Sequence, residues 1–237
     1  MQIHDPAATE VIDEADVYTE LLPLDGARVI ELGCGAAAHT RAIAETGRPA
    51  SVLACEVDAI QHGKNLEATD VPATVTFAQA GAEAIPAADD SADVVMMFKS
   101  LHHVPVEAMD AAMAEIARVL RPGGLAYISE PVFAGDFNEV LRLFHDESEV
   151  RRAAFEAVQK AVDGGVLALA EQRFFHTRND FDDFADFENR VLGVTHTEHD
   201  LSPELYERVR ATFEGYMGPE GARFTMPIRV DLLRSPA

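Results

Sequence analysis

The sequence predicts an α/β protein with a doubly wound, mostly parallel sheet. Short β-rich runs alternate with helical segments from Asp25 onward, which is typical of strand–helix–strand units with right-handed crossovers. One run, residues 94–98, is apolar throughout, as expected for a parallel strand that is covered on both faces. A glycine-rich turn, Gly33-Cys34-Gly35, leaves the first run, where the chain must pass directly into a helix.

The elements of the first half follow from this alternation. The expected strands span residues 28–32, 51–56, 74–77, 94–98 and 125–129, and the first two helices span about 38–47 and 59–68. A third helix is marked by Pro105 in its first turn. Its apolar stripe at helical spacing consists of Met109, Met113, Ile116 and Leu120. The run Arg121-Pro122-Gly123-Gly124 ends this helix.

The second half is richer in aromatic residues, since eleven of the 13 phenylalanines lie beyond residue 130. We expect a helix at 137–162, a strand at 171–177, a helix at 203–217 and a last strand at 224–233. Phe181, Phe184 and Phe187 recur three residues apart, which predicts an acidic helix. These phenylalanines either pack a core or form a lid or acceptor pocket over the carboxyl edge of the sheet.

Composition limits the classes of function. The chain of 237 residues fits one domain, contains no run of about 18 apolar residues and lacks the features of a secretory signal at its start. Its net charge of −22 disfavours nucleic acid as a partner, because phosphates are bound by Lys and Arg. Cys34 and Cys55 are expected to be free thiols in a reducing cytoplasm.

The glycine turn marks the expected ligand site, because open α/β sheets bind ligands at the carboxyl ends of their strands. The pattern Gly33-x-Gly35-x-x-Ala38 also resembles a dinucleotide fingerprint, with Glu56 near the spacing of its ribose-binding acid. However, Glu31 stands directly upstream of the turn, where a carboxylate disfavours a pyrophosphate and favours a cation. Together, Glu31 and Glu56 predict a nucleoside that carries positive charge and no phosphate.

Both acids also have plainer interpretations. Glu31 can be a strand-end acid that pairs with an arginine such as Arg28 or Arg41, and Glu56 can be a solvated strand end. Cys34 can be considered a nucleophile, but the sequence shows no base partner for it, and its small size suits a crowded turn better. No cluster of His, Cys and Asp has the spacing of metal ligands, so we expect no metal.

Six segments together resemble a known family. They are residues 29–35, 55–58, 82–86, 93–97, 100–104 and 119–124. Their order and spacing are similar to those of the S-adenosylmethionine-dependent methyltransferases with the seven-stranded Rossmann-like fold (class I), and to the subgroup that acts on small molecules. The resemblance implies an N-terminal helical segment at 1–24, an S-adenosylmethionine-binding core at 25–131, and a helical cap with the last two strands of the same domain at 132–237.

The resemblance also implies roles for single residues. Glu31 would lie near the methionine amino group, Glu56 would hold the ribose, and Val57 would pack beside the adenine. The family often has an aspartate where this chain has Gly81, so the adenine edge is expected to meet the backbone N–H groups of the next two residues. The expected cofactor-binding residues are Glu31, Gly33, Cys34, Gly35, Glu56, Val57, Ala82, Glu83, Lys99 and Ser100.

The residues expected to act on the acceptor follow the fourth and fifth strands. A general base is needed only if the acceptor atom carries a proton, and His102, His103 and Glu130 are the candidates. Alternatively, one histidine caps or packs against the following helix, and Glu130 is a strand-end acid. Lys99 is expected to meet the carboxylate of the cofactor.

The sequence thus predicts a cytoplasmic methyltransferase that uses S-adenosyl-L-methionine, releases S-adenosyl-L-homocysteine and acts on a small molecule. It predicts no nucleic-acid partner and no membrane span, and it leaves a homodimer open. The alternatives are an NAD(P)-dependent oxidoreductase and a non-catalytic regulatory module that binds the same nucleoside.

Overall fold

The structure is a computed structural model that describes residues 1–193 and 201–236. Its strands are β1 (Arg28–Leu32), β2 (Ser51–Glu56), β3 (Val75–Gln79), β4 (Ala92–Phe98), β5 (Leu120–Pro131), β6 (Ala168–Phe181), β7 (Met217–Gly218) and β8 (Gly221–Arg234). Its α-helices are α1 (Glu14–Leu21), α2 (Ala38–Glu45), α3 (Ala59–Glu67), α4 (Met109–Val119), α5 (Asp136–Leu141), α6 (Ser148–Asp163), α7 (Phe184–Phe187) and α8 (Pro203–Glu214). Short 3₁₀ turns η1 (Leu101–His103) and η2 (Val106–Ala108) follow β4, and a π-helical turn η3 (Glu188–Leu192) follows α7.

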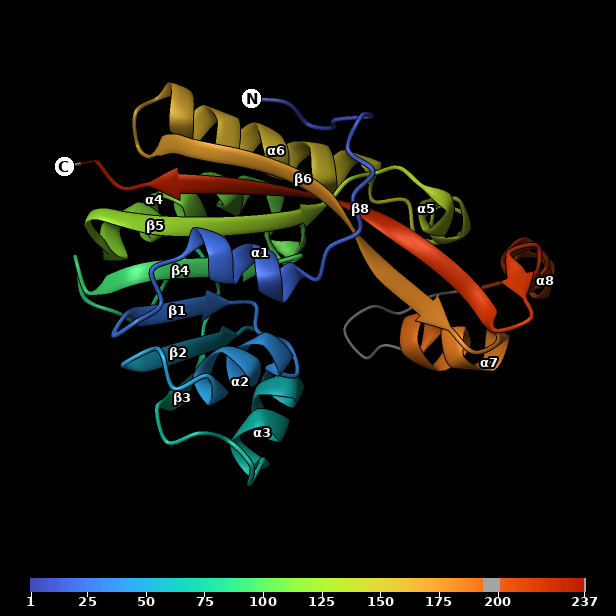
Figure 1. The fold of residues 1–237 in the computed structure, drawn as a ribbon, viewed down its shortest axis with the longest axis horizontal. Coiled ribbons are helices and arrows are strands. Elements are labelled where there is room, and N and C mark those ends of the chain that lie inside the picture. Colours follow the sequence, from blue (N-terminus) through green and yellow to red (C-terminus); the bar gives the residue numbers. More distant parts are fainter. Residues whose placement is uncertain (194–200, 237) are drawn as a thin grey trace.

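The strands form one sheet in the order β3-β2-β1-β4-β5-β8-β6, with the short β7 paired to β8 (Figure 1). The pairs among β1 to β5 are parallel, and β8 runs antiparallel to both of its long neighbours. The strand order reverses between β1 and β4, and this switch point lies directly beside the glycine turn. The predicted fold class is confirmed.

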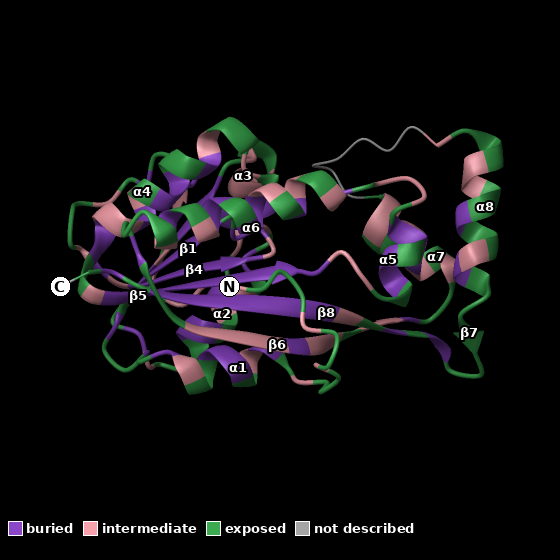
Figure 2. Ribbon diagram, turned by 90° about the horizontal axis from the view of Figure 1, so that it is seen from above, coloured by how far each residue is buried: buried purple, intermediate pink, exposed green. Residues whose placement is uncertain are grey.

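Helices cover both faces of the sheet and make two apolar cores. On one face α4 and α6 pack through residues such as Met113, Ile116 and Val158. On the other face α1 and α2 pack through residues such as Tyr18 and Ile43. The central strands β4 and β5 are buried almost throughout, as Figure 2 shows, because they lie between the two helical layers.

Five phenylalanines of the second half form the centre of a third core, which lies beyond the parallel strands. Phe137, Phe181, Phe187, Phe213 and Phe224 are all buried and pack on one another, with ring centroids 4.9 to 6.4 Å apart in the contacts they make. Figure 1 shows α7 and α8 at the far end of β6 and β8, on the side to which the parallel strands point. Core packing is therefore the correct interpretation of these five rings.

Several predicted boundaries are wrong, and the reasons are local or tertiary. The helix expected at 137–162 is divided into α5 and α6, and in the link between them the Asp146 carboxylate accepts a hydrogen bond from the N–H of Ser148 (2.9 Å), the first residue of α6. Phe181 belongs to β6 and not to a helix, since it pairs with Ala222 of β8. Leu120 opens β5, and in the segment 1–24 the α-helix covers only Glu14–Leu21.

None of the helices among the described residues combines the length and the apolar character needed to span a bilayer.

Candidate active site

The turn after β1 is packed tightly against the end of β4. Gly33 and Gly35 have positive φ angles of 69° and 51°. A Cβ at Gly33 would lie 2.6 Å from the Cβ of Ser100, so this position requires glycine. Ser100 donates its hydroxyl hydrogen to the carbonyl of Leu32 (2.8 Å), which holds the two segments together. No atom lies within 4 Å of the position that a Cβ at Gly35 would take, so the turn has open space beside it.

Glu31 lies under this turn and is almost fully buried. Its carboxylate accepts a hydrogen bond from the hydroxyl of Thr40 on α2. The pKa of Glu31 is raised to about 7, mainly by burial. The hydrogen bond from Thr40 acts in the opposite direction, and the nearby charge of Glu56 adds to the upward shift. The alternative interpretation, in which Glu31 pairs with Arg28, is not supported, because Arg28 pairs with Asp93 (2.9 Å). Within residues 1–193 and 201–236, no cationic side chain forms an ion pair with Glu31, and such a buried carboxylate is suited to bind a cation.

Glu56 stands at the end of β2 and faces the same turn. Its two oxygens accept hydrogen bonds from the N–H of Gly35 (2.7 Å) and from the N–H of Asp58 (2.8 Å). Glu56 is buried, so it is not a solvated strand end. The following residue, Val57, leaves 66% of its surface exposed, which provides an apolar platform beside the carboxylate.

Two further buried residues, Cys34 and Asn65, belong to or contact the turn. Burial raises the pKa of the Cys34 thiol far above its ordinary value, which favours a structural role over a nucleophilic one. Asn65 of α3 donates its side-chain N–H to the carbonyl of Gly35 (2.7 Å). Sequence reasoning missed Asn65, since an asparagine inside a helix gives no signal of a contact with a distant turn.

The segment after β3 carries the residues expected at the adenine edge. Ala82 is buried, whereas Glu83 is exposed. The carboxylate of Glu83 folds back over Gly81 and occupies the space where a side chain at position 81 would begin. A carboxylate is therefore present at this place, although it belongs to a residue two positions later than the family pattern implies.

Lys99 follows β4 in a strained conformation and pairs with a residue that the sequence did not indicate. Its φ angle is 53°, which a residue with a side chain adopts rarely. Its ammonium group forms an ion pair with Glu14 of α1, and Glu14 also accepts a hydrogen bond from Ser129 of β5. Glu14 is buried and connects α1 to the ends of two strands. Local sequence patterns do not indicate this contact, because Glu14 and Lys99 are 85 residues apart.

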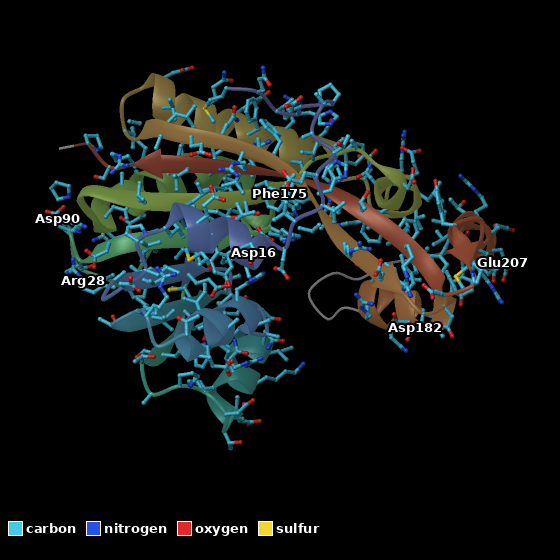
Figure 3. All side chains as sticks on the ribbon, viewed as in Figure 1. Asp16, Arg28, Asp90, Phe175, Asp182 and Glu207 are labelled. Carbon is cyan, nitrogen blue, oxygen red and sulfur yellow. The ribbon has the colours of Figure 1, made fainter. Side chains whose placement is uncertain are left out.

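A cavity of about 490 Å³ lies next to this ion pair. Its walls come from the chain before α1, from Lys99 and from the long strands β6 and β8. The lining residues are Val11, Ile12, Asp13, Glu14, Lys99, Thr177, Arg178, Asn179 and Met226. Both apolar and charged side chains line it. Lys99 follows the carboxyl end of β4, whereas Arg28 and Asp90, which Figure 3 labels, lie at the amino ends of β1 and β4.

The three candidates for acid–base chemistry lie side by side at the ends of β4 and β5. Nδ1 of His102 is 2.6 Å from one oxygen of Glu130, and the other oxygen of Glu130 accepts the N–H of Leu101 (2.9 Å). The ring of His103 is 4.1 Å from that of His102, and His103 is exposed. Glu130 is only 1% exposed and both of its oxygens are engaged, so the geometry favours a buried partner of His102 over a base for an acceptor.

A second carboxylate, Glu147, lies on the other side of His102. Nε2 of His102 is 3.6 Å from an oxygen of Glu147, which also forms an ion pair with Arg151. Although burial acts in the opposite direction, the two carboxylates raise the pKa of His102 to about 9. Glu147 was missed by sequence reasoning, since it stands in the link before α6, where a long helix was expected.

Comparisons with known proteins agree with this geometry. Residues 30–128 match the family model described as a methyltransferase domain. Methyltransferase GfsG of Streptomyces halstedii is 30% identical over 154 residues, which cover 57% of this chain and 51% of that protein. The fatty-acid O-methyltransferase of Mycolicibacterium smegmatis is 34% identical over 103 residues, 43% of this chain and 36% of that protein. The chain therefore spans about half the length of these curated relatives, or less.

Solved structures share the fold over nearly the whole chain. A candidate methyltransferase from Bacillus halodurans superposes with a TM-score of 0.65 at 16% identity, covering 94% of this chain and 98% of that one. The [4+2]-cyclase SpnF superposes with a TM-score of 0.60 at 18% identity, covering 94% of this chain and 80% of that one. At such identities the likeness shows the fold alone.

The matched domain and the shared fold agree with the resemblance to the S-adenosylmethionine-dependent methyltransferases of class I. The match to the methyltransferase domain covers residues 30–128, which is less than half of the chain. The resemblance drawn from the sequence motifs is confirmed, and S-adenosylmethionine is the cofactor of the family.

Proposed function

We propose that this protein transfers the methyl group of S-adenosylmethionine to a small-molecule acceptor. The observation that carries the proposal is the placement of two buried carboxylates, Glu31 and Glu56, around the open glycine turn. The charge of Glu56 disfavours ionisation of Glu31, so a ligand that brings positive charge into this place stabilises both. A dinucleotide would instead bring a pyrophosphate against buried negative charge, which argues against the oxidoreductase alternative.

The site fits the parts of S-adenosylmethionine one by one. The ammonium group would meet the Glu31 carboxylate, and the two ribose hydroxyls would donate to Glu56. The exposed Val57 would support one face of the adenine. We further propose that the Glu83 carboxylate accepts a hydrogen bond from the exocyclic amine of the adenine. This carboxylate lies beside position 81, where the family often has an aspartate and this chain has Gly81.

The acceptor would enter the cavity beside Lys99. When bound, the cofactor supplies an electrophilic methyl group, and alignment of the acceptor accounts for much of the rate, on the order of 7–11 kcal/mol of the barrier. The cavity combines apolar walls from Val11 and Met226 with the charged groups of Lys99 and Arg178. It suits an acceptor with an apolar body and a polar end, and the name of the mycobacterial fatty-acid O-methyltransferase points the same way.

A fold of this kind does not fix the reaction, because the similar structure SpnF is named as a cyclase. Isothermal titration calorimetry with S-adenosylmethionine, S-adenosylhomocysteine and NAD tests the cofactor first. We expect both sulfur nucleosides to bind and NAD not to bind. Tight binding of NAD without S-adenosylhomocysteine would reverse the assignment.

A second experiment tests methyl transfer itself. The protein is incubated with S-adenosylmethionine labelled at the methyl group and with a panel of fatty acids, hydroxylated lipids and small amines. Label in an acceptor of this panel supports the proposal. Cofactor binding together with an acceptor that is changed but carries no label would instead favour a reaction of another kind on the same fold.

A further inference from the structure

We infer that His102, His103 and Glu147 bind one divalent transition-metal ion of the zinc type. These residues each offer one ligand atom, and the three atoms lie within 4.8 Å of one another. Two of them, Nε2 of His102 and Oε1 of Glu147, are 3.6 Å apart. Two ligand atoms that each lie about 2.1 Å from a tetrahedral zinc ion are about 3.4 Å apart, so this pair has nearly the required spacing.

The orientation of the His102 ring is fixed by its contact with Glu130. Its Nδ1 is 2.6 Å from Glu130, which can hold a proton on that nitrogen, while Nε2 faces Glu147 and would exchange its own proton for the metal ion. A carboxylate that accepts from one nitrogen of a metal-binding histidine is a recurrent second layer of metal sites, where it fixes the ring and raises its basicity. Glu130 is itself held by the N–H of Leu101 (2.9 Å), so the whole arrangement is rigid.

The orientation of Glu147 is fixed as well. One of its oxygens forms an ion pair with the buried Arg151. The other oxygen faces the imidazoles: it is 3.6 Å from Nε2 of His102 and 3.0 Å from Nε2 of His145. The arginine thus neutralises one side of the carboxylate, while the second oxygen is presented to the histidines.

The chemistry of the donors selects the class of metal. Two imidazoles and one carboxylate suit zinc, iron or cobalt, whereas magnesium and calcium prefer oxygen ligands alone. His103 is exposed, so an ion can enter from solvent. The ion would lie between η1 and the start of α6, at the carboxyl ends of β4 and β5.

The spacing of residues along the chain predicted no metal site. His102 and His103 are adjacent, but Glu147 follows them by more than 40 residues, so the spacing along the chain does not resemble that of a known metal motif. The competing explanation is that His102 bridges Glu130 and Glu147 as an imidazolium with no ion present. The two explanations differ in what happens when metal is added.

Titration of metal-stripped protein tests the inference without cofactor or acceptor. Zinc binding is measured by calorimetry, and cobalt is used as a spectroscopic probe, since tetrahedral cobalt with nitrogen and oxygen ligands absorbs visible light. We expect one ion per chain. His103→Ala should weaken zinc binding at least 10-fold, and Glu130→Gln should weaken it by about 10- to 100-fold, the effect usual for such second-layer groups.

A matched control separates this site from incidental binding by histidine. His4→Ala also removes an exposed imidazole, but near the N-terminus, and should leave the affinity and the cobalt spectrum unchanged. His103→Ala and His4→Ala both change exposed side chains, so both should fold, which circular dichroism checks. Absence of one-to-one binding, or equal affinities of the His103→Ala and unmodified proteins, would overturn the inference.

Discussion

Glu56 closes the turn after β1 by accepting a hydrogen bond from the N–H of Gly35 at 2.7 Å. The same carboxylate is the one expected to hold the ribose, so the residue both shapes the turn and presents acceptor oxygens to the ligand. A carboxylate oxygen has room for more than one hydrogen bond, and these two tasks are compatible.

We therefore predict that Glu56→Ala weakens binding of S-adenosylmethionine by roughly 1–3 kcal/mol, because charged hydrogen bonds are lost. Calorimetry provides the measurement. Glu56→Gln serves as the matched variant, since it keeps one acceptor oxygen and should lose less. A folded Glu56→Ala protein with unchanged affinity would refute the role in ribose binding.

The pH dependence of cofactor binding should report Glu31. Its pKa is raised to about 7 in the protein, and a bound ammonium group stabilises the ionised form and lowers this pKa. Binding below pH 7 must therefore release a proton. We expect the affinity to fall by up to about tenfold per pH unit below pH 7, and to level off above it. The Glu31→Gln variant should bind more weakly and show a flatter profile.

The same carboxyl group affects the stability of the protein without cofactor. Its folded pKa of about 7 lies above the ordinary value of 4.5, so the folded state holds its proton more tightly. This contribution is fully present below pH 4.5 and is lost as the pH rises to 7, with a size on the order of 3 kcal/mol. Comparing urea unfolding of the unmodified and Glu31→Gln proteins at pH 5 and 8 isolates it. Identical pH dependence in both proteins would contradict the assignment.

Glu83 should matter for recognition of the adenine. We expect Glu83→Ala to weaken binding of S-adenosylhomocysteine by about 0.5–1.5 kcal/mol, the size of a typical hydrogen bond. Adding Gly81→Asp to that variant should restore the affinity, because removal of the Glu83 carboxylate clears the space at position 81. An analogue without the exocyclic amine is the control: its affinity should not respond to either change.

The Glu14–Lys99 contact should stabilise the fold. Glu14→Gln removes the charge that Lys99 pairs with, and it also weakens the hydrogen bond from Ser129. We expect the free energy of unfolding to fall by about 1–3 kcal/mol, which denaturant titration measures. Asp16→Asn is the matched control, because Asp16 lies on the same helix but is exposed (Figure 3). Equal losses in the two variants would show that helix charge, and not the buried contact, is responsible.

The elements that were predicted well are those whose signals are local. The strands at 28–32 and 51–56 have the predicted bounds, because apolar runs end at a glycine turn in one case and at an acid in the other. The helix predicted after Pro105 corresponds to α4, where Met109, Met113 and Ile116 of the apolar stripe are buried. These signals require only neighbouring residues, so the sequence expresses them directly.

What was missed depends on contacts between distant segments. Phe181 follows the spacing of a helix, yet pairing with Ala222 keeps it in a strand. Glu14 and Glu147 have no local pattern that sets them apart from the other acids of this acidic chain. Only the folded sheet brings Glu14 to Lys99 and Glu147 to His102, and the prediction of the site was incomplete for that reason.

The two 14-residue strands β6 and β8 have a consequence for how the molecule unfolds. Their first and last portions belong to different cores: one end completes the main sheet beside β5, and the other supports the phenylalanine cluster. The outlying helices therefore cannot dissociate as a unit without loosening the antiparallel edge of the sheet. Both regions should melt in a single cooperative transition.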